Sequence, residues 1–267
     1  MQVQDKVAII TGASQGIGRR IAEVLVNKGA CVVIADILPL GTQTAQEIND
    51  SKQASADSPV AIFQHCDVSK AEDLQKLFDV TLETFGHVDI LVNNAGFGGS
   101  GLWVDKDSEI LARTINVNLK APIDGTRLAI RQFVRANQTG CVVNVASMAA
   151  YVPIEFSPVY ASTKAGLVSF TGACATLALR TPAIRVNAVA PSFVDTAITR
   201  STPAKVNAML RTCGIITVND VATQVLRCIE DEGLAGDTIQ VLVEGSVVHD
   251  GPKSPNFGLV ANLDIEV

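Results

Sequence analysis

A tyrosine, a lysine and a serine have the spacing that proton-transfer chemistry could use. Tyr160 and Lys164 are four residues apart in an apolar, helix-forming stretch, and Ser147 lies thirteen residues before the tyrosine. Side chains four apart on a helix lie on one face, so the phenol and the ammonium would share the same space. The cation favours the phenolate, and we expect it to lower the pKa of Tyr160 below about 10. The pair is thus a candidate for general acid–base chemistry near neutral pH.

A glycine-rich segment near the start of the chain predicts a phosphate site. Residues 11–18 read TGASQGIG and follow the apolar run 7–11. Glycines permit a tight turn and let the backbone approach a pyrophosphate. A helix that begins here offers free N–H groups and a partial positive charge. The dinucleotide-binding residues predicted in this segment are Gly12, Ser14, Gln15, Gly16, Ile17 and Gly18.

An aspartate at the end of the second apolar run predicts which dinucleotide binds. Asp36 lies eighteen residues after Gly18. Its carboxylate can accept hydrogen bonds from both hydroxyls of an adenosine ribose and would repel a 2′-phosphate. Neither its successor Ile37 nor Gln15 is basic, so we predict NAD rather than NADP. The alternative is that Asp36 only ends a strand as a turn residue.

Two further strand ends carry polar or small residues. Asp67 and Val68 follow the third apolar run, where a carboxylate and a backbone N–H can reach an adenine edge. Residues 93–96 read NNAG after the fourth, and small and amide residues there leave space beside a cofactor while holding the strand end. Read alone, this tetrapeptide could be an ordinary turn. The residues predicted to bind cofactor at these ends are Ile37, Asp67, Val68, Asn94, Ala95 and Gly96.

Short apolar runs alternate with longer helical patterns along the whole chain. This alternation predicts an α/β fold with a doubly wound parallel sheet of seven strands and helices on both faces, in a single domain 1–267. Segment 192–218 and the tail 251–267 fall outside the alternation, and we expect the first to be a substrate loop. The predicted strands are 7–11, 31–36, 61–67, 90–93, 140–147, 184–191 and 238–243, and the predicted helices are 17–28, 41–49, 70–85, 108–136, 158–179 and 219–230.

The composition excludes several classes of protein. Of 267 residues, 48% are hydrophobic and 18% charged, enough for one large core. A net charge of −6 argues against a general binder of nucleic-acid backbone. The sequence has no uncharged apolar run of about 18 residues and no basic leader with a cleavage site, so we expect a cytoplasmic protein without a membrane span. The six cysteines lack CxxC or zinc-finger spacing, so we expect reduced thiols and no metal site.

Together these motifs resemble the short-chain dehydrogenase/reductase family, in its compact single-domain branch. The resemblance covers about residues 6–245 and rests on the glycine-rich segment, Asp36, Asp67, NNAG, Asn118 in VNL, Ser147, and Tyr160 with Lys164. It implies a Rossmann-type sheet that binds a nicotinamide dinucleotide at the carboxyl ends of its strands. The predicted preference for NAD is similar to that of hydroxysteroid and 15-hydroxyprostaglandin dehydrogenases.

The resemblance also implies roles for individual residues. Tyr160 would be the general acid and base, and Lys164 would bind the nicotinamide ribose and lower the pKa of Tyr160. Ser147 would hydrogen-bond the substrate oxygen. Asn118 would anchor a water that links Lys164 to solvent, and Asn116 competes for that role.

One position departs from the family pattern. The family commonly has Pro-Gly after the sixth strand, whereas this chain has Pro191 and Ser192. Because serine adopts positive φ less readily than glycine, the loop path could differ here. Pro191, Val194 and Thr196 remain the residues expected beside the nicotinamide carboxamide.

Apolar residues near these motifs indicate the type of substrate. They favour a bulky apolar secondary alcohol or ketone, such as a steroid, terpenoid, polyketide or oxidised fatty acid, of the kind found in secondary metabolism. The alternative is that several are ordinary core residues. The predicted substrate-pocket residues are Phe97, Trp103, Met148, Phe156 and Phe193.

Assembly and two other functions stay open at this point. The predicted helix 158–179 is apolar nearly all round, which favours burial against a second copy in a homodimer or homotetramer. The same residues could serve a lyase, isomerase or epimerase that uses bound NAD transiently. A non-catalytic dinucleotide-binding protein is the third alternative.

Overall fold

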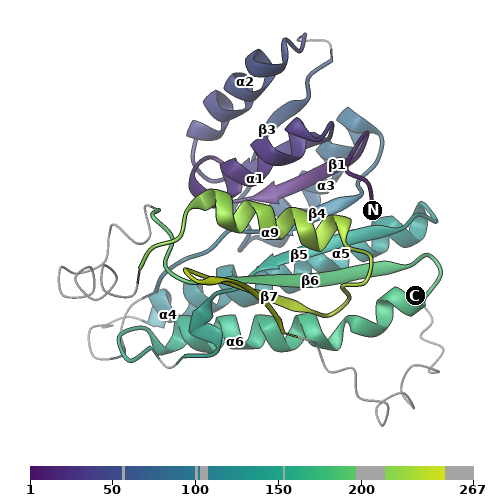
Figure 1. The fold of residues 1–267 in the computed structure, drawn as a ribbon. Helices are drawn as coiled ribbons and strands as arrows, with labels where there is room; N and C mark the ends of the chain where they lie inside the picture. Colours follow the sequence, from purple (N-terminus) through teal and green to yellow (C-terminus); the bar gives the residue numbers. More distant parts are fainter. Residues whose placement is uncertain (56–57, 100–101, 103–107, 153, 197–213, 250–267) are drawn as a thin grey trace.

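An eight-stranded sheet forms the centre of the molecule (Figure 1). The computed structural model describes residues 1–55, 58–99, 102, 108–152, 154–196 and 214–249. The strand order is β3-β2-β1-β4-β5-β6-β7-β8, so the chain reverses its direction of winding between β1 and β4. The strands are β1 (Val7–Thr11), β2 (Cys31–Asp36), β3 (Ala61–His65), β4 (Ile90–Asn93), β5 (Gly140–Val145), β6 (Ile184–Pro191), β7 (Thr238–Leu242) and β8 (Gly245–His249).

Helices cover both faces of this sheet. Helices α1, α2 and α9 pack on one face, in a core cluster that includes Leu25, Ile48 and Val225. Helices α3 and α5 pack on the other face around Phe78 and Phe133. The helices are α1 (Gly16–Asn27), α2 (Leu40–Lys52), α3 (Ala71–Phe85), α4 (Ser108–Ile115), α5 (Ala121–Arg135), α6 (Pro158–Ala173) and α9 (Val218–Glu230). The doubly wound α/β fold predicted from the sequence is therefore confirmed.

The central strands form because their side chains are apolar on both sides. Every residue of β1, β4, β5 and β6 is buried. Runs of this kind, rich in Val, Ile and Ala, suit a parallel sheet that helices cover on both faces. Four predicted strands have the observed bounds, and the other three end one or two residues earlier than predicted.

The predicted number of strands is wrong by one. The structure adds β8, which pairs antiparallel with β7 through a turn at Val243 and Glu244. Gly245, with φ of 130°, begins the returning strand. Most of β8 is exposed, so it lacks the continuous apolar run that marked the other strands.

Two long predicted helices are interrupted. The predicted helix 108–136 consists of α4, the π-helical turn η1 (Asn116–Lys120) and α5. The predicted helix 158–179 consists of α6 and the 3₁₀ segment η3 (Ala175–Leu179). The remaining helices lie where the sequence placed them, although α2 extends to Lys52, beyond the predicted end at residue 49.

A buried network of amides and hydroxyls joins the sheet to the helices that carry the candidate site. Asn93 of β4 donates to the Asn144 side chain at 2.9 Å and to the carbonyl of Pro122 in α5 at 3.2 Å. Asn144 of β5 in turn donates to Thr171 of α6 at 3.0 Å. Because buried polar groups are costly without partners, this network favours one register of α6 against β5.

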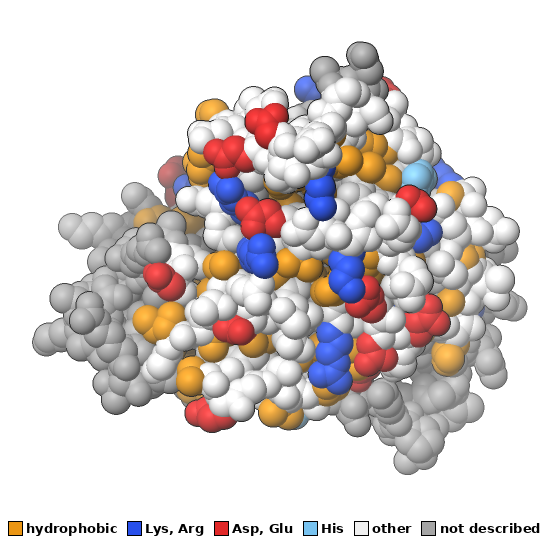
Figure 2. Space-filling model, turned by 45° about the horizontal axis from the view of Figure 1, so that its top comes forward, with side chains coloured by type: hydrophobic (Ala, Val, Ile, Leu, Met, Phe, Trp, Pro, Cys, Tyr) orange, Lys and Arg blue, Asp and Glu red, His pale blue; other side chains and the backbone are white. Residues whose placement is uncertain are grey.

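The described surface shows neither a membrane span nor a single-sign patch on the face in view. Within the described ranges, none of the helices has the length and apolar character needed to cross a bilayer. Acidic and basic side chains are interspersed over the face in Figure 2. Some form ion pairs between helices, such as Arg19 of α1 with Glu47 of α2 at 2.8 Å.

The side chain of Arg185 in β6 caps the carboxyl end of α9. Its buried guanidinium donates to the carbonyls of Cys228 at 2.8 Å and Asp231 at 3.0 Å, and also to that of Ile229. The last carbonyls of a helix have no partner within the helix, so this side chain satisfies groups that would otherwise be buried without one.

Replacing Arg185 by Ala should therefore destabilise the protein. We expect the free energy of unfolding to fall by about 2–4 kcal/mol, because several buried carbonyls lose a charged donor. Urea unfolding followed by circular dichroism measures this change. The control is Arg131→Ala, which removes an exposed arginine from α5 and should change the free energy of unfolding by less than about 0.5 kcal/mol. Equal effects of the two substitutions would contradict the capping role.

Candidate active site

A cavity of about 610 Å³ opens at the carboxyl ends of the parallel strands. Each of the strands β1 to β6 contributes lining residues at its carboxyl end or just after it. In an open α/β sheet this edge, at the point where the winding reverses, is where ligands bind. Most of the predicted site residues meet here: the cavity is lined by Gly12, Gln15, Gly16, Ile17, Asp36, Ile37, Asp67, Val68, Asn94, Ala95, Gly96, Phe97, Ser147, Phe156, Tyr160, Lys164, Pro191, Phe193, Val194 and Thr196.

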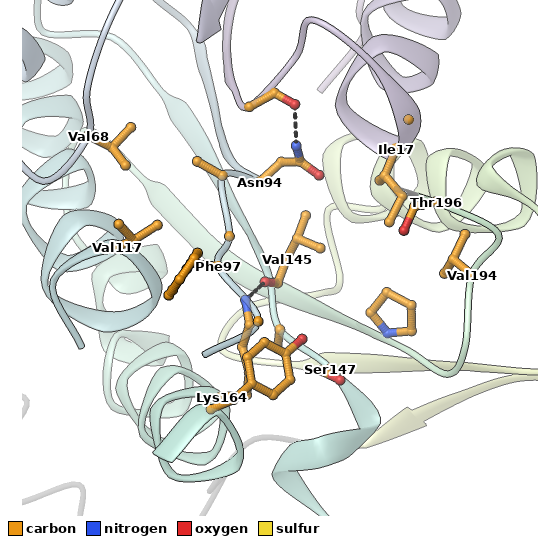
Figure 3. A pocket seen from close by; sticks show the side chains of 18 of the residues that line it. Ile17, Val68, Asn94, Phe97, Val117, Val145, Ser147, Lys164, Val194 and Thr196 are labelled. Atoms are coloured by element: carbon orange, nitrogen blue, oxygen red, sulfur yellow. Dashed lines mark hydrogen bonds between the residues drawn. The ribbon is translucent and has the colours of Figure 1, made fainter. Parts of the chain in front are cut away.

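The glycine-rich turn between β1 and α1 is held from below by Asn94. The Asn94 amide donates to the carbonyl of Thr11 at 2.8 Å. It also donates to the carbonyl of Gly12 at 3.0 Å (Figure 3). Gly12 has a φ of 65°, and a Cβ there would lie 2.8 Å from the Cα of Ala95. A glycine is thus required both by the backbone conformation and by the close approach of β4.

Two residues of the glycine motif face away from the cavity. A Cβ on Gly18 would lie 2.5 Å from the Asn94 amide nitrogen, so this glycine serves close packing beneath the turn. Ser14 is buried and its hydroxyl donates to the carbonyl of Leu38 at 3.2 Å. Neither is among the described lining residues, so the prediction that they contact a cofactor stays untested, and their observed contacts shape the turn.

Asp36 lies at the end of β2 with its carboxylate at the cavity wall. It is 8% exposed and accepts hydrogen bonds from the N–H groups of Ser14 at 2.9 Å and Leu38 at 3.0 Å. These two bonds fix the carboxylate while leaving each oxygen a further acceptor position. The side chain is therefore placed to receive a pair of hydroxyls.

The end of β3 forms the neighbouring wall. Asp67 accepts hydrogen bonds from the N–H of Ser69 at 3.1 Å and from its hydroxyl at 2.7 Å. Burial acts to raise the pKa of Asp67, but the bonds from Ser69 and the charges of Lys70 and Arg113 bring it below its ordinary value. The group is thus an ionised acceptor at neutral pH.

Lys164 reaches the floor of the cavity from α6. Its ammonium donates to the carbonyl of Val145 at 2.8 Å, and the residue is 4% exposed (Figure 3). Burial lowers the pKa of Lys164 to about 8, because the charged form loses its hydration. The lysine therefore carries its charge at neutral pH and loses it under mildly alkaline conditions.

Tyr160 lies one helical turn earlier and hydrogen-bonds Ser147 at the end of β5. The lysine nitrogen is 5.7 Å from the centre of the tyrosine ring. Burial raises the pKa of Tyr160 above 10 and the bond from Ser147 lowers it, with burial the larger effect. The shift of the Tyr160 pKa in the described structure is thus opposite to the one expected from the sequence, because burial outweighs the effect of Ser147.

Asn118 lies in the π-helical turn η1 and is fully buried. Its side-chain oxygen accepts from the N–H of Phe97 at 2.7 Å, and its amide donates to the Phe97 carbonyl at 2.7 Å. Asn118 does not line the cavity; it clamps the backbone that does. The predicted water between Asn118 and Lys164 stays a prediction.

The segment after β6 closes another side of the cavity. The N–H of Ser192 donates to the Val241 carbonyl at 2.9 Å, and Val194 forms a bridge with Ile216. Ser192 does not have positive φ, so serine replaces the usual glycine there without backbone strain. Its hydroxyl oxygen is buried and makes no hydrogen bond with the described part of the chain. Residues 197–213 of the expected substrate loop and the tail 251–267 lie outside the described residues.

Of the predicted substrate residues, three are aromatic lining groups. Phe97, Phe156 and Phe193 line the cavity, whereas Met148 packs against a small core cluster instead. Trp103 lies outside the described residues. Sequence reasoning missed several other lining residues, among them Arg113, Val117, Val145 and Ser157. Val117 directly precedes Asn118, and Arg113 lies one helical turn before Val117. This spacing from Asn118 could have indicated both residues.

These residues fit a nicotinamide dinucleotide. A glycine cradle without room for a Cβ, a fixed carboxylate at Asp36 and a buried ammonium at Lys164 all face one cavity. Glycines and a helix start suit phosphates, and the carboxylate suits ribose hydroxyls.

Comparison with known proteins identifies the family. The model for short chain dehydrogenases matches residues 6–207. The chain is similar to 15-hydroxyprostaglandin dehydrogenase (NAD(+)) of Homo sapiens, with 33% identity over 90% of this chain and 92% of the relative. It is similar to the short chain dehydrogenase helC of Aspergillus fumigatus, with 34% identity over 91% and 98% of the two chains. A crystal structure of a short chain dehydrogenase/reductase from Burkholderia phymatum in complex with NAD superposes with a TM-score of 0.79 and 26% identity, over 90% of each chain.

The chain belongs to the short-chain dehydrogenase family. The family resemblance predicted from the motifs is confirmed, and with it the class of enzyme, a dehydrogenase.

Substituting Gly12 by Ala should weaken cofactor binding at the turn. The new methyl group would meet the backbone of Ala95 and force the turn away from its position. We expect NADH affinity, measured by fluorescence titration, to fall by at least about tenfold, which corresponds to about 1.4 kcal/mol.

Gly86→Ala is the matched control for Gly12→Ala. Gly86 also has positive φ, 82°, but a Cβ added there would meet nothing within 4 Å. This variant should lose roughly 1–2 kcal/mol of stability from backbone strain and keep its NADH affinity. If Gly12→Ala bound NADH as tightly as Gly86→Ala, the close approach of β4 would not matter for the cofactor.

Proposed function

We propose that this protein interconverts a secondary alcohol and a ketone on a bulky apolar substrate, with Tyr160 as general acid and base. The main support is that one cavity contains both sets of residues. It is lined by Tyr160, its partner Ser147 and Lys164, and also by the glycine-rich turn and Asp36. Proton donor and dinucleotide cradle are thus held in one space by α6, β5 and β1.

NAD is the cofactor, and it supplies hydride acceptance and donation when bound. On this chain, Asp36 supports NAD rather than NADP. Its carboxylate is fixed by two backbone N–H groups at the end of β2, and a 2′-phosphate there would meet a negative charge. The relatives named for NAD agree with this choice.

The chain's own residues account for the proton. Ser147 can donate to or accept from a substrate oxygen beside the phenol, which orients that oxygen toward Tyr160. In ketone reduction the neutral phenol delivers the proton, and its raised pKa keeps it protonated at neutral pH. In alcohol oxidation the phenol must first lose that proton, so the positive charge of Lys164 assists this direction.

Apolar side chains at the catalytic end support the substrate class. Ile154, Phe156 and Phe193 line the cavity there. Among the described lining residues, basic side chains are limited to Lys164 and Arg113. A bulky apolar alcohol or ketone, such as a steroid, terpenoid, polyketide or oxidised fatty acid, suits such walls. A homodimer or homotetramer, a cytoplasmic location and a role in secondary metabolism remain predictions.

Tyr160→Phe tests the proposed chemistry. It removes the hydroxyl and keeps the ring, so NADH binding should persist while turnover falls by roughly 10²–10⁴-fold. Wild type and variant are compared by absorbance, following NADH formation and consumption over a panel of apolar secondary alcohols and ketones. Full activity in the variant would remove Tyr160 from the mechanism.

The second tyrosine of the chain provides a matched control. Tyr151 does not line the cavity but stacks on His249, with ring centres 5.4 Å apart. Tyr151→Phe keeps that stack and should retain wild-type turnover. One NADH per substrate oxidised supports a dehydrogenase. Product formation without net NADH would instead favour a lyase, isomerase or epimerase, and NADH binding without any turnover would favour a non-catalytic protein.

A further inference from the structure

Arg113 of α4 is a basic residue of the cavity that the proposed mechanism does not use. It lines the cavity together with Val117, four residues further along the chain. Its guanidinium makes no hydrogen bond or ion pair with the described residues, so its five N–H donors are available. This property distinguishes it from Lys164, whose ammonium is bound to a carbonyl.

The guanidinium lies on a fixed aromatic platform. The Arg113 Cζ is 4.6 Å from the centre of the Phe97 ring. Asn118 holds both the N–H and the carbonyl of Phe97, each at 2.7 Å. A guanidinium stacked on a ring that is itself fixed loses little further freedom when it pairs with an anion.

The charge of Arg113 is felt by an acidic residue of the same cavity. Its charge contributes to the lowered pKa of Asp67, at the end of β3. By contrast, burial alone accounts for the shift at Lys164, and burial with the Ser147 bond accounts for that at Tyr160. Arg113 therefore acts on the carboxylate at the end of β3, while its guanidinium lies on Phe97.

The acidic side chains of the cavity provide no positive partner for a phosphate. Asp36 and Asp67 add negative charge to the lining, and a dinucleotide brings two negative phosphates of its own. The glycine-rich turn offers N–H groups from one wall only. Among the described lining residues, positive charge is limited to Lys164 and Arg113, and the Lys164 ammonium is already bound to the Val145 carbonyl.

We propose that Arg113 is a cofactor-binding residue whose guanidinium pairs with the phosphates of the dinucleotide in this cavity. The pairing is a charge-assisted hydrogen bond between guanidinium and phosphate oxygen. The proposal rests on the proposed function only in taking NAD as the cofactor.

Arg113→Gln tests this pairing by direct binding. Calorimetry with NADH, AMP and adenosine, at low and high salt, compares the wild type with three variants. For Arg113→Gln we expect NADH and AMP to bind roughly three- to tenfold more weakly, adenosine to bind unchanged, and the salt dependence to shrink. Arg113→Lys keeps the charge and should retain most of the affinity. Arg131→Gln removes an exposed arginine of α5 that does not line the cavity and should bind all three as the wild type does.

Other results would overturn the proposal. Unchanged NADH affinity in Arg113→Gln would do so, and so would an equal loss for adenosine and AMP, which would indicate lost stacking. A changed KM for the alcohol with unchanged NADH affinity would assign Arg113 to the substrate instead. This experiment measures binding and needs no turnover. A negative result would therefore not bear on the proposed dehydrogenase reaction, which the Tyr160→Phe assay tests separately.

Discussion

The site depends on one buried cation. Lys164 is held under the cavity by the carbonyl of Val145 at 2.8 Å, so α6 cannot slide along β5 without leaving an ammonium buried and unpaired. That contact fixes Tyr160 one turn earlier on the helix and brings it to Ser147 at the end of the same strand. The Asn144–Thr171 bond two turns further along α6 secures the same register.

A second constraint joins the two halves of the cavity. Asn94 at the end of β4 holds the glycine-rich turn, and two residues later Gly96 begins the segment that Asn118 clamps through Phe97. A Cβ on Gly96 would lie 3.7 Å from the Asn118 side-chain oxygen and 3.9 Å from the Lys164 nitrogen. The strand at the winding reversal therefore places the cofactor turn and the catalytic floor relative to one another.

Most of the sheet could be predicted because each central strand is a continuous buried run, as in β1 and β6. The exposed strand β8 lacks that signal, and the π-helical turn at Asn116–Lys120 has the side-chain pattern of an ordinary helix. The motifs predicted most residues that gather at the cavity but not which of them line it, since Ser14 and Gly18 are not among the described lining residues. The direction of the Tyr160 pKa shift also escaped prediction, because it depends on burial, which the YxxxK spacing does not report.

The fold holds a half-buried phenol, protonated at neutral pH, beside the predicted dinucleotide cradle. Ultraviolet difference titration of the cofactor-free protein measures this directly, because the chain has two tyrosines and the Tyr160→Phe variant leaves one. Subtracting the variant's curve from that of the wild type gives the ionisation of Tyr160 alone. We expect a phenol that stays protonated past pH 10, because burial raises the pKa of Tyr160. A phenol that ionises near neutral pH without cofactor would contradict it.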